Sequence, residues 1–108
     1  MLSVLLEFSM FPISEACRDG SSVAKYVSKV IDAIDKSGVP YQLTPMGTVI
    51  EASSMKEALG IVELAYAQLD DCERVYSSLK FDIRKNCENR LKTKIESVEK
   101  ILNREINH

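Results

Sequence analysis

The chain lacks the residue combinations on which most enzymes and metal proteins depend. Its single histidine, His108, is the last residue, and its three cysteines, Cys17, Cys72 and Cys87, form no Cys-x-x-Cys pair. Tetrahedral zinc needs four thiolate or imidazole ligands in suitable spacing, so no metal site is predicted. A glycine-rich phosphate loop and a nucleophile-elbow serine are also missing. The sequence therefore predicts no catalytic residues, no metal and no cofactor.

An excess of one charge and a long apolar run are missing as well. The chain has 14 basic and 16 acidic residues, for a net charge of -2. Proteins that bind nucleic acid or anionic membranes usually carry a basic surface, so neither partner is predicted. No apolar run approaches the roughly 20 residues that span a bilayer, and residues 1–6 lack the basic residues of a signal peptide. We therefore expect a cytoplasmic protein with reduced cysteine thiols.

The residues that are present have the composition of one globular domain spanning residues 1–108. The chain is 45% hydrophobic and 28% charged, and its length is sufficient for a single core without cross-links. Alternating hydrophobic residues predict strands over 2–11 and 75–84. A 3.6-residue apolar period predicts helices between Ser22 and Gly38, over 55–69 and over 91–102. Ser54 and Glu57 have the spacing of a capping box at the start of the second helix.

Residues 40–51 predict a tight hairpin between two further strands. Pro45 cannot donate to a central ladder, and Gly47 can adopt backbone angles closed to other residues, so Pro45-Met46-Gly47 is predicted as the turn. Glu51 then falls in a strand inside the sheet. A carboxylate in such a strand must be paired, solvated in a cavity or bound to a ligand. Glu51 is therefore the first candidate for a functional residue.

The order of these elements predicts the fold class. Strand, helix, strand, strand, helix and strand form two split βαβ units with right-handed crossovers. We expect an α+β, ferredoxin-like βαββαβ sandwich with a four-stranded antiparallel sheet, two helices on one face and an extra C-terminal helix. The other face of the sheet is then uncovered by its own chain.

Alternation along the strands gives the side chains of this uncovered face. They are predicted to be Glu7, Ser9, Gln42, Thr44, Met46, Val49, Glu51, Tyr76, Ser78, Lys80, Asp82 and Arg84. The first and third strands are expected to be central neighbours, so Glu7 and Glu51 can lie close together and need a cation. That cation is either Lys80 or Arg84 or a cationic ligand. A charged face in water and a face buried against a second subunit both remain open.

Several segments of the chain together resemble the small thiamine-binding protein family, over nearly the whole length. The most specific of them is the hairpin Pro45-Met46-Gly47-Thr48-x-x-Glu51. The opening strand ending in Phe11-Pro12-Ile13 and the run Leu79-Lys80-Phe81-Asp82-Ile83-Arg84 are compatible with the same family. The chain departs from the family in residues 14–20, which lack a small-residue run, and at Ala52, where a glycine is usual.

The resemblance implies a non-enzymatic protein that binds thiamine or its hydroxymethylpyrimidine part. It also implies a homotetramer, a dimer of dimers joined through the sheets. Glu7 and Glu51 would balance the positive thiazolium ring, hydroxyl groups would hydrogen-bond the ligand, and Met46 or Tyr26 would pack against it. The predicted ligand-binding residues are Glu7, Ser9, Ser22, Tyr26, Thr44, Met46, Thr48 and Glu51. Ser22 also suits plain N-capping of the first helix.

Two other functions remain open at this point. One is a structural or regulatory homo-oligomer with no small-molecule ligand, in which the uncovered face only packs against its copies. The other is an enzyme that acts on thiamine-like substrates. The ligand's physiological form and the pathway served do not follow from the sequence.

Overall fold

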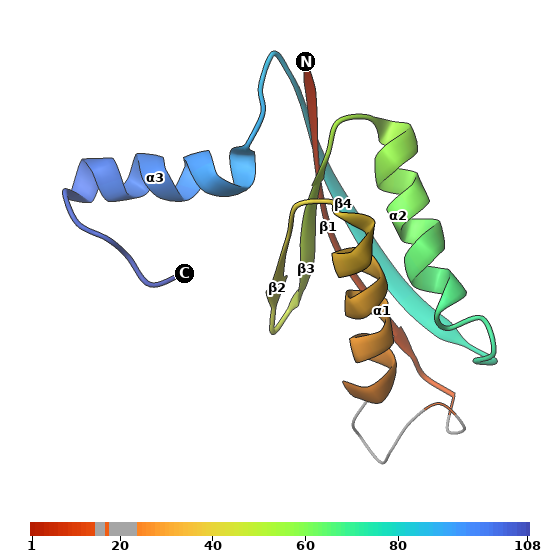
Figure 1. The fold of residues 1–108 in the computed structure, drawn as a ribbon. Helices are drawn as coiled ribbons and strands as arrows, with labels where there is room; N and C mark the ends of the chain where they lie inside the picture. Colours follow the sequence, from red (N-terminus) through yellow and green to blue (C-terminus); the bar gives the residue numbers. More distant parts are fainter. Residues whose placement is uncertain (15–16, 18–23) are drawn as a thin grey trace.

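The computed structural model describes residues 1–14, 17 and 24–108 (Figure 1). The elements are β1 (Leu2–Pro12), α1 (Ala24–Ser37), β2 (Tyr41–Thr44), β3 (Gly47–Ala52), α2 (Met55–Ala67), β4 (Val75–Lys85) and α3 (Arg90–Leu102). Their order is the predicted one. Within the described residues, no helix is long and apolar enough to cross a membrane.

The four strands form one antiparallel sheet in the order β2-β3-β1-β4. Helices α1 and α2 lie side by side on one face of this sheet, whereas α3 lies on the other side (Figure 1). The predicted α+β, ferredoxin-like fold is therefore confirmed, with β1 and β3 as its central strands.

Alternation along β1 produces the core. Val4, Leu6 and Phe8 point towards α1 and α2 and are buried. On the helices, Ile34 of α1 and Ala65 of α2 are buried in the same cluster as Leu6 and Phe8. The side chains that recur every second residue in β1 and about every 3.6 residues in the helices thus pack together in one core.

Most of the residues predicted to end α1 and to cap α2 do so in the structure. Gly38 follows α1 with a φ of 81°, the left-handed conformation typical of a glycine after a helix. The Glu57 amide donates to Ser54 Oγ at 3.0 Å. The other half of the predicted capping box differs, because the Glu57 carboxylate accepts from the amide and hydroxyl of Ser53 rather than from Ser54.

Gly47 is needed for a different reason from the predicted one. Among the described glycines, Gly38 and not Gly47 has a positive φ. A Cβ atom on Gly47 would instead lie 2.9 Å from the backbone oxygen of Phe8. The glycine therefore allows the tip of the hairpin to approach β1 closely.

The prediction of reduced thiols is wrong for two of the three cysteines. Cys17 and Cys72 form a disulfide across 55 residues, with their Cα atoms 5.9 Å apart, and Cys87 is free. The bond joins the segment after β1 to the segment between α2 and β4. Because these segments meet only once β1 and α2 are packed together, the spacing of the cysteines in the sequence gives no sign of it.

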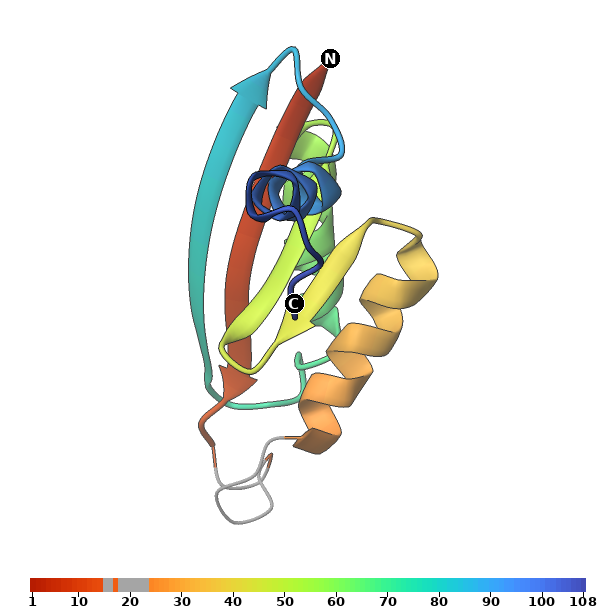
Figure 2. The same cartoon turned by 90° about the vertical axis from the view of Figure 1, so that its left-hand side faces the viewer.

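Helix α3 leaves the body of the domain. Its first turn meets the sheet, and the rest of the helix points away from the face opposite α1 and α2 (Figures 1 and 2). Its last residues are solvent-accessible, with Ile101 84% exposed. Apart from the start of α3, the described part of the chain leaves this face of the sheet uncovered.

Candidate functional site

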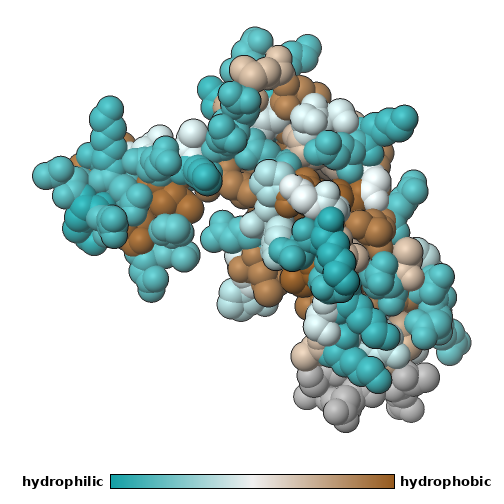
Figure 3. Space-filling view, in the orientation of Figure 1, coloured by the Kyte–Doolittle hydropathy of each residue, from teal (hydrophilic) through white to brown (hydrophobic). Residues whose placement is uncertain are grey.

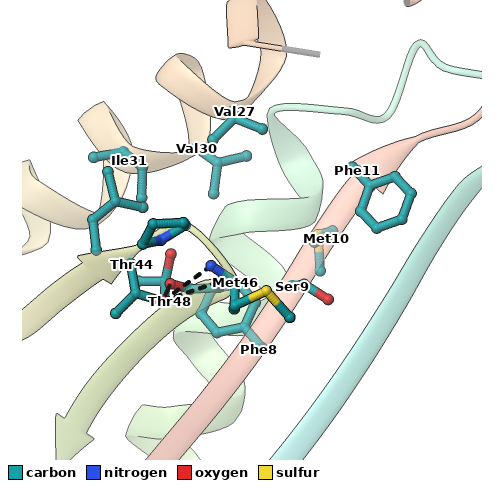
Figure 4. Close-up of a pocket in the computed structure, with 13 residues that line it drawn as sticks. Phe8, Ser9, Met10, Phe11, Val27, Val30, Ile31, Thr44, Met46 and Thr48 are labelled. Atoms are coloured by element: carbon teal, nitrogen blue, oxygen red, sulfur yellow. Dashed lines mark hydrogen bonds between the residues drawn. The ribbon is translucent and has the colours of Figure 1, made fainter. Parts of the chain in front are cut away.

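A pocket of about 310 Å³ lies at the tip of the β2–β3 hairpin. It is bounded by the hairpin, the end of β1 and one side of α1 (Figure 4). Its lining residues are Phe8, Ser9, Met10, Phe11, Val27, Val30, Ile31, Leu43, Thr44, Pro45, Met46, Gly47 and Thr48. Its volume is near the lower end of the range for small-molecule sites.

Apolar side chains form most of the pocket wall. Phe8 and Met10 come from β1, and Val27 and Val30 lie across from them on α1 (Figure 4). Phe11 also borders the pocket, but its ring points away from α1 (Figure 4). Sequence reasoning assigned Phe8 and Met10 to the core and missed that their ends reach a pocket. The alternation of β1 gives the face of each side chain, but the opening depends on how far α1 stands from the hairpin.

Three hydroxyl groups supply polar atoms around the pocket. Thr44 Oγ accepts the amides of Met46 and Gly47, both at 3.2 Å, and donates to the Gly47 carbonyl at 2.9 Å. These bonds close the turn and occupy the Thr44 hydroxyl. Thr48 is 6% exposed, and within the described residues neither its hydroxyl nor that of Ser9 makes a hydrogen bond. Ser9 and Thr48 are thus the hydroxyls left for a ligand.

Glu51 lies elsewhere, at the start of α3, and is 9% exposed. Its carboxylate accepts from Ser3 Oγ at 2.6 Å and from the amides of Arg90 and Leu91 at 3.0 and 3.2 Å. Asn89, the residue before the helix, makes no side-chain capping bond. Glu51 therefore caps α3 from a distant strand, where a carboxylate also suits the helix dipole.

The surroundings of Glu51 favour its charged form. Burial by itself raises the pKa of a carboxyl group. For Glu51, the hydrogen bond from Ser3, the two amide hydrogen bonds and the charge of Arg90 outweigh burial, so its pKa lies below the ordinary value. Glu51 is consequently an ionised structural group and is not poised for proton transfer near neutral pH.

Arg90 completes this cluster and was missed by sequence reasoning. Its Nε donates to Ser3 Oγ at 2.8 Å, and its Nη2 donates to the carbonyls of Ser3 and Asp82 at 2.8 and 2.7 Å. Its Nη1 lies 3.0 Å from Asp82 Oδ2. We call Ser3, Glu51, Asp82 and Arg90 the α3 anchor. The carboxylate predicted inside the sheet at Glu51 was the signal that a cation was needed, but only Lys80, Arg84 and a cationic ligand were considered.

Glu7 has a separate cation. It faces Lys80 across β1 and β4, and Lys80 Nζ lies 3.5 Å from Glu7 Oε1 with both side chains largely exposed. Such surface pairs contribute little to stability. Glu7 and Glu51 share a face of the sheet, but Val49 and Leu5 are their partners across β1 and β3.

The structure divides the predicted ligand residues into two groups. Ser9, Thr44, Met46 and Thr48 line the pocket at the hairpin tip. Glu7, Tyr26 and Glu51 lie outside this lining. Tyr26 packs against the core and under the amino group of Lys29, which is 4.9 Å from the ring centroid. Ser22 lies outside the described residues.

One cluster in the described part of the chain has side chains that could ligate a metal. The ligand atoms of Cys17, Asp71 and Cys72 lie within 4.8 Å of one another. The two sulfur atoms are bonded to each other in the disulfide, so neither is a free thiolate, which is the form that binds metals. In this state, the cluster offers a metal only the carboxylate of Asp71.

Comparison with known proteins gives a consistent set of relatives. The family model described as thiamine-binding protein matches residues 6–99. A UPF0045 protein of Methanocaldococcus jannaschii is 35% identical over 98 residues, which cover 91% of this chain and 94% of the relative. A UPF0045 protein of Methanothermobacter thermautotrophicus is 30% identical over 97 residues, with 88% and 95% covered.

Solved structures agree with this grouping. The crystal structure of a hypothetical protein from Methanocaldococcus jannaschii is similar at a TM-score of 0.73 and 36% identity, with 91% of this chain and 97% of that chain covered. A Thermotoga maritima protein provisionally assigned to thiamine biosynthesis or salvage has a TM-score of 0.70 at 22% identity, with 89% and 98% covered, which supports the fold alone. The matched family model, the relatives and the fold lead to one conclusion: this chain belongs to the thiamine-binding protein family.

Proposed function

We propose that this protein binds thiamine or its hydroxymethylpyrimidine part and catalyses no reaction on it. The observation that carries the proposal is the pocket at the hairpin tip, in a chain whose family is described as thiamine-binding. Apolar walls suit the flat faces of an aromatic ring. The hydroxyls of Ser9 and Thr48 suit the amino group and ring nitrogens of a pyrimidine.

We infer that the pyrimidine half of the ligand enters the pocket. The thiazolium half carries a permanent positive charge, and a buried charge needs a partner of opposite charge. The pocket lining contains no carboxylate among the described residues, and both Glu7 and Glu51 lie outside it. The neutral pyrimidine ring therefore suits the interior, and the charged ring suits the solvent-accessible mouth.

The predicted residues take different roles in this proposal. Ser9 and Thr48 donate or accept hydrogen bonds, and Thr44 keeps the turn closed. Met46 is 87% exposed, and its flexible thioether suits an apolar cover that packs on the ligand. Glu51 belongs to the α3 anchor, outside the pocket lining, and takes no part in binding.

Calorimetric titration with thiamine and with hydroxymethylpyrimidine tests this function. Thr48→Val removes one hydroxyl at nearly constant volume, and one hydrogen bond lost corresponds to a Kd about three- to tenfold weaker. Thr93→Val makes the same change on exposed α3 and should leave the Kd unchanged. Wild-type protein that releases no heat with thiamine, its phosphates or the pyrimidine would remove this ligand class.

We further propose that the protein is a cytoplasmic homotetramer, a dimer of dimers whose sheets face each other. Apolar groups on the uncovered face support this assembly. The rings of Phe11 and Tyr76 lie 5.9 Å apart on that face, and Tyr76 is exposed. Figure 3 shows further apolar surface on α3 and beside the β2–β3 hairpin. Exposed apolar surface is a feature of many protein–protein interfaces.

The same surface favours a second candidate function, a structural or regulatory homo-oligomer without a ligand. The two candidates differ in one measurable respect. A tetramer that gives no heat in the titration above would support the second candidate, whereas binding that depends on Thr48 supports the first.

A further inference from the structure

The Cys17–Cys72 disulfide lies where the end of β1 leaves the sheet. Cys17 follows β1, and Cys72 lies between α2 and β4. One backbone hydrogen bond connects the same segments, because the Ile13 amide donates to the Arg74 carbonyl at 3.0 Å. A second, from the Cys17 amide to the Ser14 carbonyl at 3.0 Å, closes a turn within the segment that carries Cys17. The cross-link therefore fixes the chain just beyond β1.

The disulfide is also part of the packing behind the pocket. Cys17 and Cys72 are 3% and 5% exposed and belong to the same buried cluster as Phe8, Met10 and Val30. Those three side chains line the pocket (Figure 4). Protein interiors are close-packed, so separating two bonded sulfur atoms moves the side chains around them.

We propose that Cys17 and Cys72 form a redox-controlled cross-link that sets the shape of the pocket. With the disulfide closed, β1 and α1 hold the pocket walls in the arrangement seen here. With the two thiols reduced, the end of β1 loses its covalent tie to the α2–β4 connection, and the walls become mobile. The consequence for thiamine affinity rests on the proposed function, whereas the consequence for the pocket walls does not.

The chemistry is reversible thiol–disulfide exchange. The thiolate of one cysteine attacks a disulfide such as oxidised glutathione and releases one glutathione thiolate. The other cysteine then attacks the mixed disulfide and releases the second, so the protein loses two protons and two electrons, which the oxidant gains. A dithiol reverses both steps. In a cytoplasmic protein, such a disulfide is typically transient and redox-sensing.

Cys87 provides a matched control within the chain. It follows β4, and the adjacent Asn86 amide donates to the Met1 carbonyl at 2.8 Å. Cys87 is therefore at the end of the sheet opposite the disulfide, since Pro12 pairs with Val75 at the other end. Cys87→Ser should change neither the pocket nor the cross-link.

The first measurement follows the cross-link and the pocket walls directly. The full chain is treated with oxidised glutathione or with dithiothreitol, then unfolded and alkylated with N-ethylmaleimide. Mass spectrometry should find one adduct per oxidised chain, at Cys87, and three per reduced chain. Hydrogen exchange should be faster after reduction in residues 8–12 and 24–31 and unchanged in α3.

The second measurement follows binding. Thiamine should bind the reduced protein and the Cys17→Ser/Cys72→Ser double variant about tenfold more weakly than the oxidised protein, because a mobile site loses preorganisation. If the double variant does not fold, chemical reduction of the wild type gives the same comparison. Three adducts on the oxidised chain, or hydrogen exchange that reduction leaves unchanged, would overturn the proposal. If neither form binds thiamine, the proposed function fails, and the exchange rates alone decide on the cross-link.

Discussion

At the scale of residues, Glu51 shows how a carboxylate becomes stable inside a sheet. It accepts three hydrogen bonds, one from Ser3 and two from the first amides of α3. Arg90, equally buried, donates four hydrogen bonds to Ser3 and Asp82. Each charge is stable in the interior because the anchor compensates it, so loss of either one leaves the rest of the cluster with unpaired groups.

Glu51→Gln should therefore lower the free energy of unfolding by about 2 to 4 kcal/mol near neutral pH. Because the pKa of Glu51 is lowered in the folded state, its contribution is present above the unfolded pKa and is lost as pH falls through the folded pKa. The difference in free energy of unfolding between the variant and the wild type should thus be smaller in acid. Urea denaturation of both proteins at about pH 7 and about pH 3 measures this difference.

Glu7→Gln is the control for this prediction, since Glu7 is an exposed carboxylate paired with Lys80. It should change the free energy of unfolding by less than about 1 kcal/mol. A Glu51→Gln variant as stable as Glu7→Gln at neutral pH would show that the anchor contributes nothing to the fold.

Gly47→Ala tests the close approach of the hairpin to β1. The new Cβ would lie 2.9 Å from the Phe8 carbonyl oxygen, and because this atom is backbone, the hairpin must shift, at a cost of about 1 to 3 kcal/mol. Gly60→Ala in α2 meets nothing within 4 Å and should stabilise the protein by up to about 1 kcal/mol. Thermal unfolding of both variants compares them, and equal midpoints would contradict the predicted crowding.

At the scale of elements, α3 depends for its stability on contacts at its two ends. A helix of 13 residues is marginal in water without tertiary support. Its support comes from the anchor at its start and from the C-terminal tail, where the Ile106 amide donates to Glu99 Oε2 at 2.9 Å. The direction in which α3 leaves the sheet is therefore set at Arg90.

Arg90→Ala should release α3 while the sheet stays folded. We expect faster hydrogen exchange in α3, because its first amides lose an ordered partner when the anchor opens. Exchange in the central strands β1 and β3 should change much less. Lys94→Ala, an exposed change on the same helix, is the control, and equal exchange in the two variants would show that α3 is held by other contacts.

The elements themselves were predictable from the sequence, because their signals are local. The alternation of β1, the apolar period of α1 and α2, and the Pro45-Met46-Gly47 turn each depend on neighbouring residues. The α3 anchor and the Cys17–Cys72 bond depend on residues that the fold brings together across 39 and 55 positions. Of the residues that line the pocket, sequence reasoning singled out Ser9 in β1 and Thr44, Met46 and Thr48 in the hairpin, whereas the wall on α1 depends on tertiary packing.

At the scale of the whole molecule, the two faces of the sheet are unequal. One face is covered by α1 and α2, and the other meets only the start of α3 among the described residues (Figure 2). The long strand β4 forms one edge of the sheet. A chain with such a face and edge is expected to bury them against copies of itself.

Light scattering of the full chain should accordingly give a mass about four times 12.1 kDa. Tyr76→Glu places a charge on the uncovered face and should lower this mass, because an unpaired charge is costly to bury in an interface. Asp70→Asn, an exposed change outside the sheet, should leave the mass as it is. A wild-type monomer at micromolar concentration would end the tetramer proposal.

The most direct measurement of the proposed binding site is a titration of thiamine followed through the amide chemical shifts of the isotope-labelled protein. We expect the largest changes at the hairpin tip, the end of β1 and the facing side of α1, at amides such as those of Gly47, Phe11 and Val30. The amides of Glu51 and Arg90 should change little. Changes centred on Glu51 and Glu7, or no change at saturating thiamine, would contradict the pocket as the ligand site.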